Sequence, residues 1–247
     1  MKLRFLLAPA ATLAMCAAGL LYAQPAADPL VEGLRLVEVA SVADAAEQLY
    51  GQRIYMSHDM RPIFTAKFAG PAVTVLLKKE EHHEGPAASQ GMLDAIDAAP
   101  PGSVYVIVLE DGLDIAGIGG LMSTAMKYRG LAGAVVDASV RDLPQIKRLQ
   151  FPVFSRGIVP STSINHYRFA GANIPVTCAG ARVNPNDIDA AITRSGPSSR
   201  APVTQDAPTF VRHCMPMTKG RFIAAYITTW ARANWFPFGN NFTPRFR

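Results

Sequence analysis

Three apolar runs rich in β-branched residues constrain the fold of this chain more than any other feature. They cover residues 68–77, 103–109 and 134–140, and charged residues follow each of them directly. Continuous apolar runs of this length predict strands that are buried on both faces. Apolar residues with helical spacing precede or separate these runs at residues 42–50, 92–98 and 121–128. Strands that alternate with helices in this way predict a layered α/β fold.

The chain is long enough for one large domain of this kind. It has 247 residues, of which 49% are apolar and 17% charged, and this composition favours a packed core over a disordered chain. Further strands are expected near residues 152–154 and within 174–183, where they would form a second packed sheet or close a barrel-like core. We expect the α/β domain to cover residues 30–189.

The beginning of the chain, residues 1–23, has the organisation of a signal peptide. Two basic residues precede an apolar run over residues 5–21, and small residues surround the expected cleavage site after Ala23. A lipoprotein signal at Cys16 and an uncleaved anchor are the alternatives. A cleaved signal peptide predicts an exported protein, periplasmic or secreted, without a stable membrane span.

Two cysteines, Cys178 and Cys214, remain after such a cleavage. An exported protein meets an oxidising compartment, where two cysteines are able to pair. The sequence leaves open whether they form a disulfide or stay thiols, because pairing depends on the distance between them in the fold.

The end of the chain, residues 190–247, is a divergent basic tail. It holds 8 Lys and Arg residues against one acidic residue, whereas residues 1–189 hold 16 against 18. The body of the chain has no basic groove interleaved with aromatic residues, so we expect no nucleic-acid partner. The tail itself is expected to be solvated or to contact anionic surfaces.

Two features predict a binding site after the third apolar run. Gly119 and Gly120 precede a helix, and the free backbone N–H groups at a helix start attract anions. Arg141 and Asp142 follow the strand, and ligands of α/β folds commonly bind beyond such strand ends. Arginine can hold a carboxylate through two hydrogen bonds, and aspartate suits Mg²⁺ or Mn²⁺. The alternative is that Arg141 and Asp142 form a surface ion pair or cap the next helix.

Several blocks in the same order make the chain similar to a known family. The family contains the regulator of ribonuclease E activity A (RraA) and the class II 4-hydroxy-4-methyl-2-oxoglutarate aldolases. The resemblance covers roughly 60% of the chain. The matching blocks are FAGPAVTV (68–75), PGSVYVIV (101–108), GIGGLMSTAMKYRGLAGAVVDASVRD (117–142), FPVFSRG (151–157) and RVNPNDI (182–188). The resemblance implies a layered β/β/α domain of the swivelling type, assembled as homotrimers or larger rings with sites between subunits.

The resemblance also implies a divalent-metal-dependent lyase that releases pyruvate from a small α-keto acid. The reaction would be aldol cleavage of 4-hydroxy-4-methyl-2-oxoglutarate, decarboxylation of oxaloacetate, or both. Arg141 would bind the substrate carboxylate and the developing enolate, and Asp142 would hold Mg²⁺ or Mn²⁺. Four further residues would line the substrate: Gly119, Gly120, Leu121 and Met122.

The chain departs from the pattern of the aldolases at several positions. Gly120 stands where they carry an acid, and Gln145 stands where they favour another. Ala138 replaces a customary glycine, and no final apolar strand is recognisable after Asp187. Because proton transfer and metal binding depend on such acids, the alternative function is a catalytically inactive binding or regulatory protein on the same scaffold.

Overall fold

One nine-stranded mixed sheet forms the centre of the protein. The computed structural model describes residues 28–51, 54–64, 66–192 and 209–213. The strands of the sheet are β1 (Arg61–Pro62), β2 (Lys67–Lys79), β3 (Val104–Leu109), β4 (Ala116–Ile118), β5 (Gly133–Val140), β6 (Val153–Ile158), β7 (Tyr167–Ala172), β10 (Ile188–Ile192) and β11 (Thr209–His213). Their order is β1-β6-β5-β3-β2-β10-β11, with β4 beside β5 and β7 beside β2. Strands β6, β5, β3 and β2 are parallel, so their carboxyl ends lie at the same edge.

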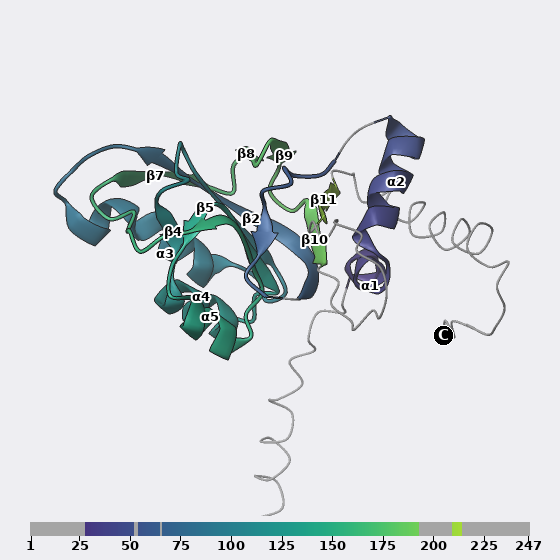
Figure 1. Cartoon of the computed structure of the whole chain (residues 1–247), viewed down its shortest axis with the longest axis horizontal. Coiled ribbons are helices and arrows are strands. Elements are labelled where there is room, and N and C mark those ends of the chain that lie inside the picture. The colour runs from purple at the N-terminus through teal and green to yellow at the C-terminus, as the bar shows by residue number, and fades with distance from the viewer. Residues whose placement is uncertain (1–27, 52–53, 65, 193–208, 214–247) are drawn as a thin grey trace, which may run out of the picture.

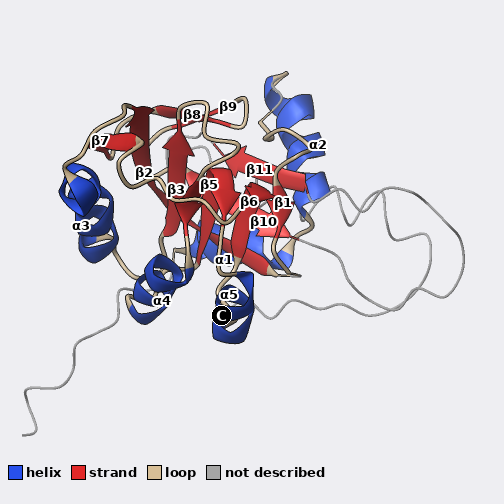
Figure 2. Ribbon diagram, turned by 60° about the vertical axis from the view of Figure 1, so that its left-hand side comes forward, coloured by secondary structure: helices blue, strands red, loops and turns tan. Residues whose placement is uncertain are grey.

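Helices cover one face of the sheet, and a β-hairpin covers the other. The helical face carries η1 (Gly85–Ser89), α3 (Gln90–Ala98), α4 (Gly120–Tyr128) and α5 (Leu143–Leu149). The opposite face carries the hairpin of β8 (Val176–Cys178) and β9 (Ala181–Val183). Figures 1 and 2 show these layers. The expected layered α/β fold is confirmed, and the second β layer is this hairpin.

Side chains of the central strands alternate between two apolar cores. In β3, Tyr105, Ile107 and Leu109 pack in the core beneath the helices, whereas Val106 and Val108 pack in the core beneath the hairpin. This alternation is the two-residue period of a strand. The apolar run is continuous because β3 has a core on each side.

Two helices precede the sheet, α1 (Pro29–Leu36) and α2 (Val39–Tyr50). The side chain of Asp28 caps α1 by accepting a hydrogen bond from the N–H of Leu30 at 2.8 Å. Helix α2 begins at Val39, three residues before the predicted start, and ends at Tyr50 as predicted, with Gly51 as its C-cap in the left-handed conformation. None of the helices in the described part of the chain combines the length and the hydrophobicity that crossing a bilayer requires.

A strand follows Asp187, although the sequence there shows no recognisable final strand. Residues 188–192 form β10, which pairs antiparallel with residues 67–71 of β2, and β11 then pairs antiparallel with β10. The centre of the sequence IDAAI, Asp189-Ala190-Ala191, consists of residues that are depleted in strands, so its strand conformation depends on pairing with β2. The predicted signal peptide, Cys214 and most of the basic tail lie outside the described residues, while Cys178 is buried in β8.

A charged cluster centred on Arg156 connects the sheet to the segments that cover its hairpin face. The guanidinium of Arg156 in β6 contacts Asp59 at 2.6 Å and Asp137 in β5 at 3.0 Å. The other oxygen of Asp137 accepts the N–H of Ala179 in the β8–β9 hairpin at 2.6 Å. Burial opposes ionisation of Asp59, but hydrogen bonds from Ser57 and Arg156 outweigh it, and the pKa of Asp59 lies below its ordinary value. Asp137 is therefore part of the structural framework.

Replacing Arg156 by alanine is expected to destabilise the fold by about 2–3 kcal/mol, because the Asp137 side chain, only 12% exposed, would lose its counter-ion. Urea unfolding measures this loss.

The pH dependence of this loss follows from Asp59. Because the pKa of Asp59 is lowered in the folded state, its contribution to the free energy of unfolding is present above about pH 4 and is lost as the pH falls through the folded-state pKa. The difference between the wild-type protein and Arg156→Ala should therefore shrink at pH 3. Arg182→Ala, at an exposed arginine of β9, is the control, and an equal effect of both variants would contradict the role of the cluster.

Candidate functional site

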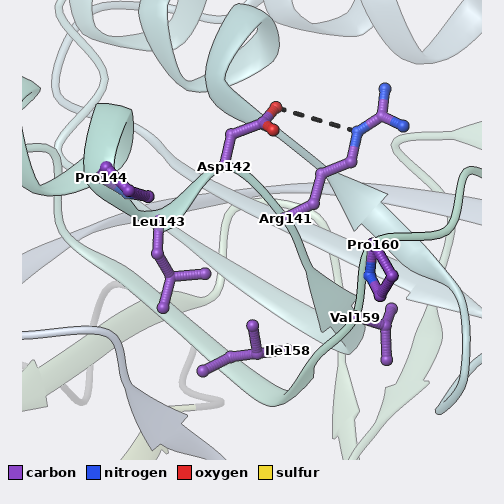
Figure 3. Close-up of a pocket in the computed structure, with 7 residues that line it drawn as sticks. All are labelled: Arg141, Asp142, Leu143, Pro144, Ile158, Val159 and Pro160. Atoms are coloured by element: carbon purple, nitrogen blue, oxygen red, sulfur yellow. Dashed lines mark ion pairs between the residues drawn. The ribbon is translucent and has the colours of Figure 1, made fainter.

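A pocket lies beyond the carboxyl ends of β5 and β6. Its volume is about 530 Å³, and it is lined by Arg141, Asp142, Leu143, Pro144, Ile158, Val159 and Pro160. Figure 3 shows the side chains of Arg141 and Asp142 next to each other, with the apolar side chains of the pocket to the left of them and below them. The parallel arrangement of β5 and β6 brings the two lining segments to the same edge of the sheet.

The backbone of Asp142 adopts the left-handed conformation, with φ +58° and ψ +39°. Asp142 occupies the N-cap position of α5, yet its side chain makes no capping hydrogen bond to that helix. Instead, Oδ2 accepts the N–H of Gly120, the first residue of α4, at 2.9 Å. The N-cap of α4 is Gly119, which has no side chain, so Asp142 supplies the missing cap from another segment. The carboxylate thus lies at the positive end of the α4 dipole.

Arg141 is partly fixed and partly available. One terminal nitrogen, Nη1, donates to the carbonyl of Ser161 at 3.3 Å, and Nε lies 3.8 Å from Oδ2 of Asp142. Its side chain is 40% exposed at the pocket. Within the described residues its remaining N–H groups make no hydrogen bond, so they can bind an anion that enters the pocket.

The structure brings two of the four predicted substrate-lining residues to this pair. A Cβ atom on Gly119 would lie 2.7 Å from Oδ2 of Asp142 and 3.0 Å from Cγ of Arg141, so only glycine allows this close approach. Gly120 holds Asp142 through its N–H. The side chain of Leu121 is 82% exposed, and that of Met122 is buried in the core beneath the helices. Met122 can therefore contribute only its backbone.

Gln145 packs onto Gly120 and fills the space that a side chain there would need. A Cβ atom on Gly120 would collide with the amide of Gln145. The Nε2 of Gln145 donates to Oγ1 of Thr124 at 3.1 Å, and Thr124 donates to the carbonyl of Gly120 at 2.7 Å. The two departures from the aldolase pattern are thus in contact. Sequence reasoning missed Thr124. Its position one helical turn after Gly120 could have indicated that its side chain reaches the start of α4.

The site offers one carboxylate to a divalent cation. Among the described residues, no group of three His, Cys, Asp or Glu side chains is arranged to hold a metal. Oδ2 of Asp142 is engaged by Gly120, and the side chain is 48% exposed, which leaves Oδ1 able to bind a cation. Mg²⁺ keeps several water ligands and often contacts a protein through one or two carboxylates. The residues present therefore fit a hydrated Mg²⁺ or Mn²⁺ ion held by Asp142.

Residues 39–191 match the family model described as RraA-like: Aldolase/RraA. A protein of Halalkalibacterium halodurans named "Putative 4-hydroxy-4-methyl-2-oxoglutarate aldolase" is 28% identical over 155 residues, which are 62% of this chain and 68% of that protein. One similar structure is that of Streptomyces coelicolor RraAS2, described as an unusual member of the RNase ES inhibitor RraA protein family. The match covers 84% of this chain and 94% of the RraAS2 chain, with a TM-score of 0.67 and 23% identity. A structure described as a novel cellulase from gut-associated microbes matches 83% of this chain and 85% of its own, with a TM-score of 0.71 and 16% identity. These two structural likenesses show the fold alone.

The contact between Gly120 and Gln145 predicts that substitutions at the two positions are not additive. Gly120→Ala should destabilise the protein by about 1 kcal/mol, because the added methyl group displaces the Gln145 amide from Thr124. In a Gln145→Ala background the same change should be neutral or stabilise by up to about 0.5 kcal/mol, because alanine is a better helix former than glycine. Urea unfolding of the four proteins measures this coupling, and equal effects of Gly120→Ala in both backgrounds would contradict the contact.

Proposed function

Because the chain belongs to the RraA-like family, we propose that it is a divalent-metal-dependent lyase that breaks a carbon–carbon bond in α-keto acids and releases pyruvate. The observation that carries this proposal is the placement of Arg141 and Asp142 side by side in one pocket, against the start of α4. The name of the Halalkalibacterium relative supports the same class of substrate. The candidate substrates are oxaloacetate and 4-hydroxy-4-methyl-2-oxoglutarate.

Both reactions leave the electron pair of the broken bond on pyruvate as an enolate. In oxaloacetate, the bond to the remote carboxylate breaks, CO₂ leaves, and a proton adds to the enolate carbon. In the aldol substrate, the hydroxyl proton leaves as the bond breaks, so that one pyruvate departs as the ketone and the other as the enolate. A divalent cation held by Asp142 would supply Lewis-acid stabilisation of this negative charge. Arg141 would bind the keto-acid carboxylate and stabilise the enolate oxygen through its free N–H groups.

The residues around the pocket favour decarboxylation over aldol cleavage. Aldol cleavage needs a base that accepts the hydroxyl proton, whereas CO₂ leaves oxaloacetate without one. The pocket lining contains one carboxylate, Asp142, and that group is needed for the metal. At the position of Gly120, an acid would have to displace Gln145. We therefore propose oxaloacetate as the better substrate.

A catalytically inactive binding or regulatory protein is the second candidate. The contact between Gly120 and Gln145 favours it, because a neutral amide fills the space where the aldolases of the family carry an acid. Such a protein would keep Arg141 as an anion-binding residue and would release no pyruvate.

The proposal includes export and self-assembly. The predicted signal peptide supports a periplasmic or secreted protein, in which a cytoplasmic ribonuclease or nucleic acid would not be the partner. Two large apolar side chains near the pocket support assembly into a homotrimer or larger ring, because Leu121 is 82% and Ile158 is 62% exposed in the single chain.

Arg141→Ala is expected to reduce pyruvate release about 100-fold or more, because a donor aimed at the developing charge is removed. Pyruvate is measured from purified protein with Mg²⁺ or Mn²⁺ and oxaloacetate, and a chelator should abolish the release. Arg148→Ala, at an exposed basic residue of α5, is the matched control. Unchanged release by Arg141→Ala, or in excess chelator, would refute the proposed lyase.

The ratio of the two activities tests the assignment of substrate. With equal concentrations of protein and metal, kcat/KM for oxaloacetate should exceed that for 4-hydroxy-4-methyl-2-oxoglutarate by at least about tenfold, because the described pocket lining holds no carboxylate besides Asp142 to act as a base for the aldol reaction. A preference for the aldol substrate would show that a base is supplied by a group outside the described pocket lining. Release from neither substrate would favour the inactive binding protein.

A further inference from the structure

We propose that Gln145 makes this site bind a divalent cation and an α-keto acid together, each only weakly without the other. The identity of the two ligands rests on the proposed function, but the inference concerns their binding rather than their turnover. Its starting point is the contact of the Gln145 amide with Gly120, whose N–H holds the carboxylate of Asp142.

The Gln145 side chain is held in place by a hydrogen bond from its amide nitrogen. Its Nε2 donates to Thr124 at 3.1 Å, which directs Oε1 toward Gly120, where a Cβ atom would collide with it. The backbone N–H of Gln145 donates to the carbonyl of Asp142 at 2.9 Å, so the residue is also part of the turn that begins α5. A neutral amide therefore lies against Gly120, the residue whose N–H holds Asp142, and Asp142 is the one carboxylate in the described pocket lining.

The charge of the site is balanced before any ligand binds. Arg141 and Asp142 carry opposite charges, with Nε 3.8 Å from Oδ2, and Gln145 adds none. A divalent cation at Asp142 would gain one anionic ligand and would be repelled by the nearby guanidinium of Arg141. An anion at Arg141 would similarly be repelled by Asp142. Each ligand alone therefore binds at a partial electrostatic cost.

An α-keto acid and a divalent cation remove these costs for each other. The acid brings two oxygen atoms, one from the carboxylate and one from the keto group, and such oxygens are ligands that Mg²⁺ and Mn²⁺ prefer. The acid also provides the anion that Arg141 can bind through its free N–H groups. The two ligands are thus expected to bind cooperatively, and linkage requires each to raise the affinity for the other by the same factor.

Mn²⁺ and oxalate test this coupling without turnover, since oxalate is an unreactive dicarboxylate that can present two oxygens in the same manner. Binding of Mn²⁺ to the purified protein is measured by electron paramagnetic resonance with and without oxalate, after correction for the complex that forms in solution. Binding of oxalate is measured by calorimetry with and without Mn²⁺. Each ligand should raise the affinity for the other at least about tenfold, and the two factors should agree.

Gln145→Glu tests whether the neutral side chain at residue 145 causes the coupling between the two ligands. The added carboxylate should raise the affinity for Mn²⁺ alone about tenfold and should reduce the coupling to oxalate. Lys147→Gln is the matched control, because it changes the net charge by the same amount from an exposed position two residues along α5 and should leave both values unchanged. Arg141→Ala should abolish the effect of oxalate.

The possible outcomes separate this inference from the proposed function. Tight binding of Mn²⁺ without oxalate, or coupling that Gln145→Glu leaves unchanged, would overturn the inference even if the protein releases pyruvate. Binding of neither ligand under any of these conditions would also overturn it. Cooperative binding with the expected response to Gln145→Glu, but without pyruvate release, would support the inference and refute the lyase.

Discussion

The hydrogen bond from the N–H of Gly120 to the carboxylate of Asp142 is the interaction on which the site depends. It joins the start of α4 to the residues that follow β5, and the two segments are adjacent because β4, which leads into α4, pairs in parallel with β5. It also requires a left-handed backbone at Asp142, which turns the carboxylate away from its own helix. The position of Arg141 beside it, and the need for glycine at residue 119, follow from this one contact.

The sequence predicted the central strands and the helices that cover them better than the elements at the two ends of the domain. The central strands were predictable because burial on both faces makes their sequences continuously apolar. Helices α3 and α4 were predictable because burial on one face places apolar residues at helical spacing. Strand β10 was missed because its pairing with β2, and not its composition, determines its conformation. Helix α1 was missed although Asp28 and Pro29 form a standard helix start, because the helical spacing in this region was assigned to a single helix over residues 42–50.

Within the site, the sequence could indicate which residues are unusual but not how they meet. Arg141 and Asp142 are neighbours in the chain, so their proximity was predictable. The contact of Gln145 with Gly120 was not, because it depends on how α4 and α5 pack against each other. In the structure, the two departures from the aldolase pattern are coupled. The amide of Gln145 occupies the volume that a side chain at residue 120 would need. A glycine and a glutamine that look like separate losses are therefore mutually compatible.

The middle of β5 and the segment that follows its carboxyl end have different roles. Asp137, in the middle of the strand, joins Arg156 and the hairpin on one face of the sheet, whereas the pocket lies where the strand has ended and the chain has turned toward α5. The charged groups that join the sheet to the hairpin, Asp137 and Arg156, are not among the described residues that line the pocket. Selection can therefore alter the chemistry of the pocket while the fold persists, and an inherited scaffold of this kind is able to outlast the reaction for which it was first selected.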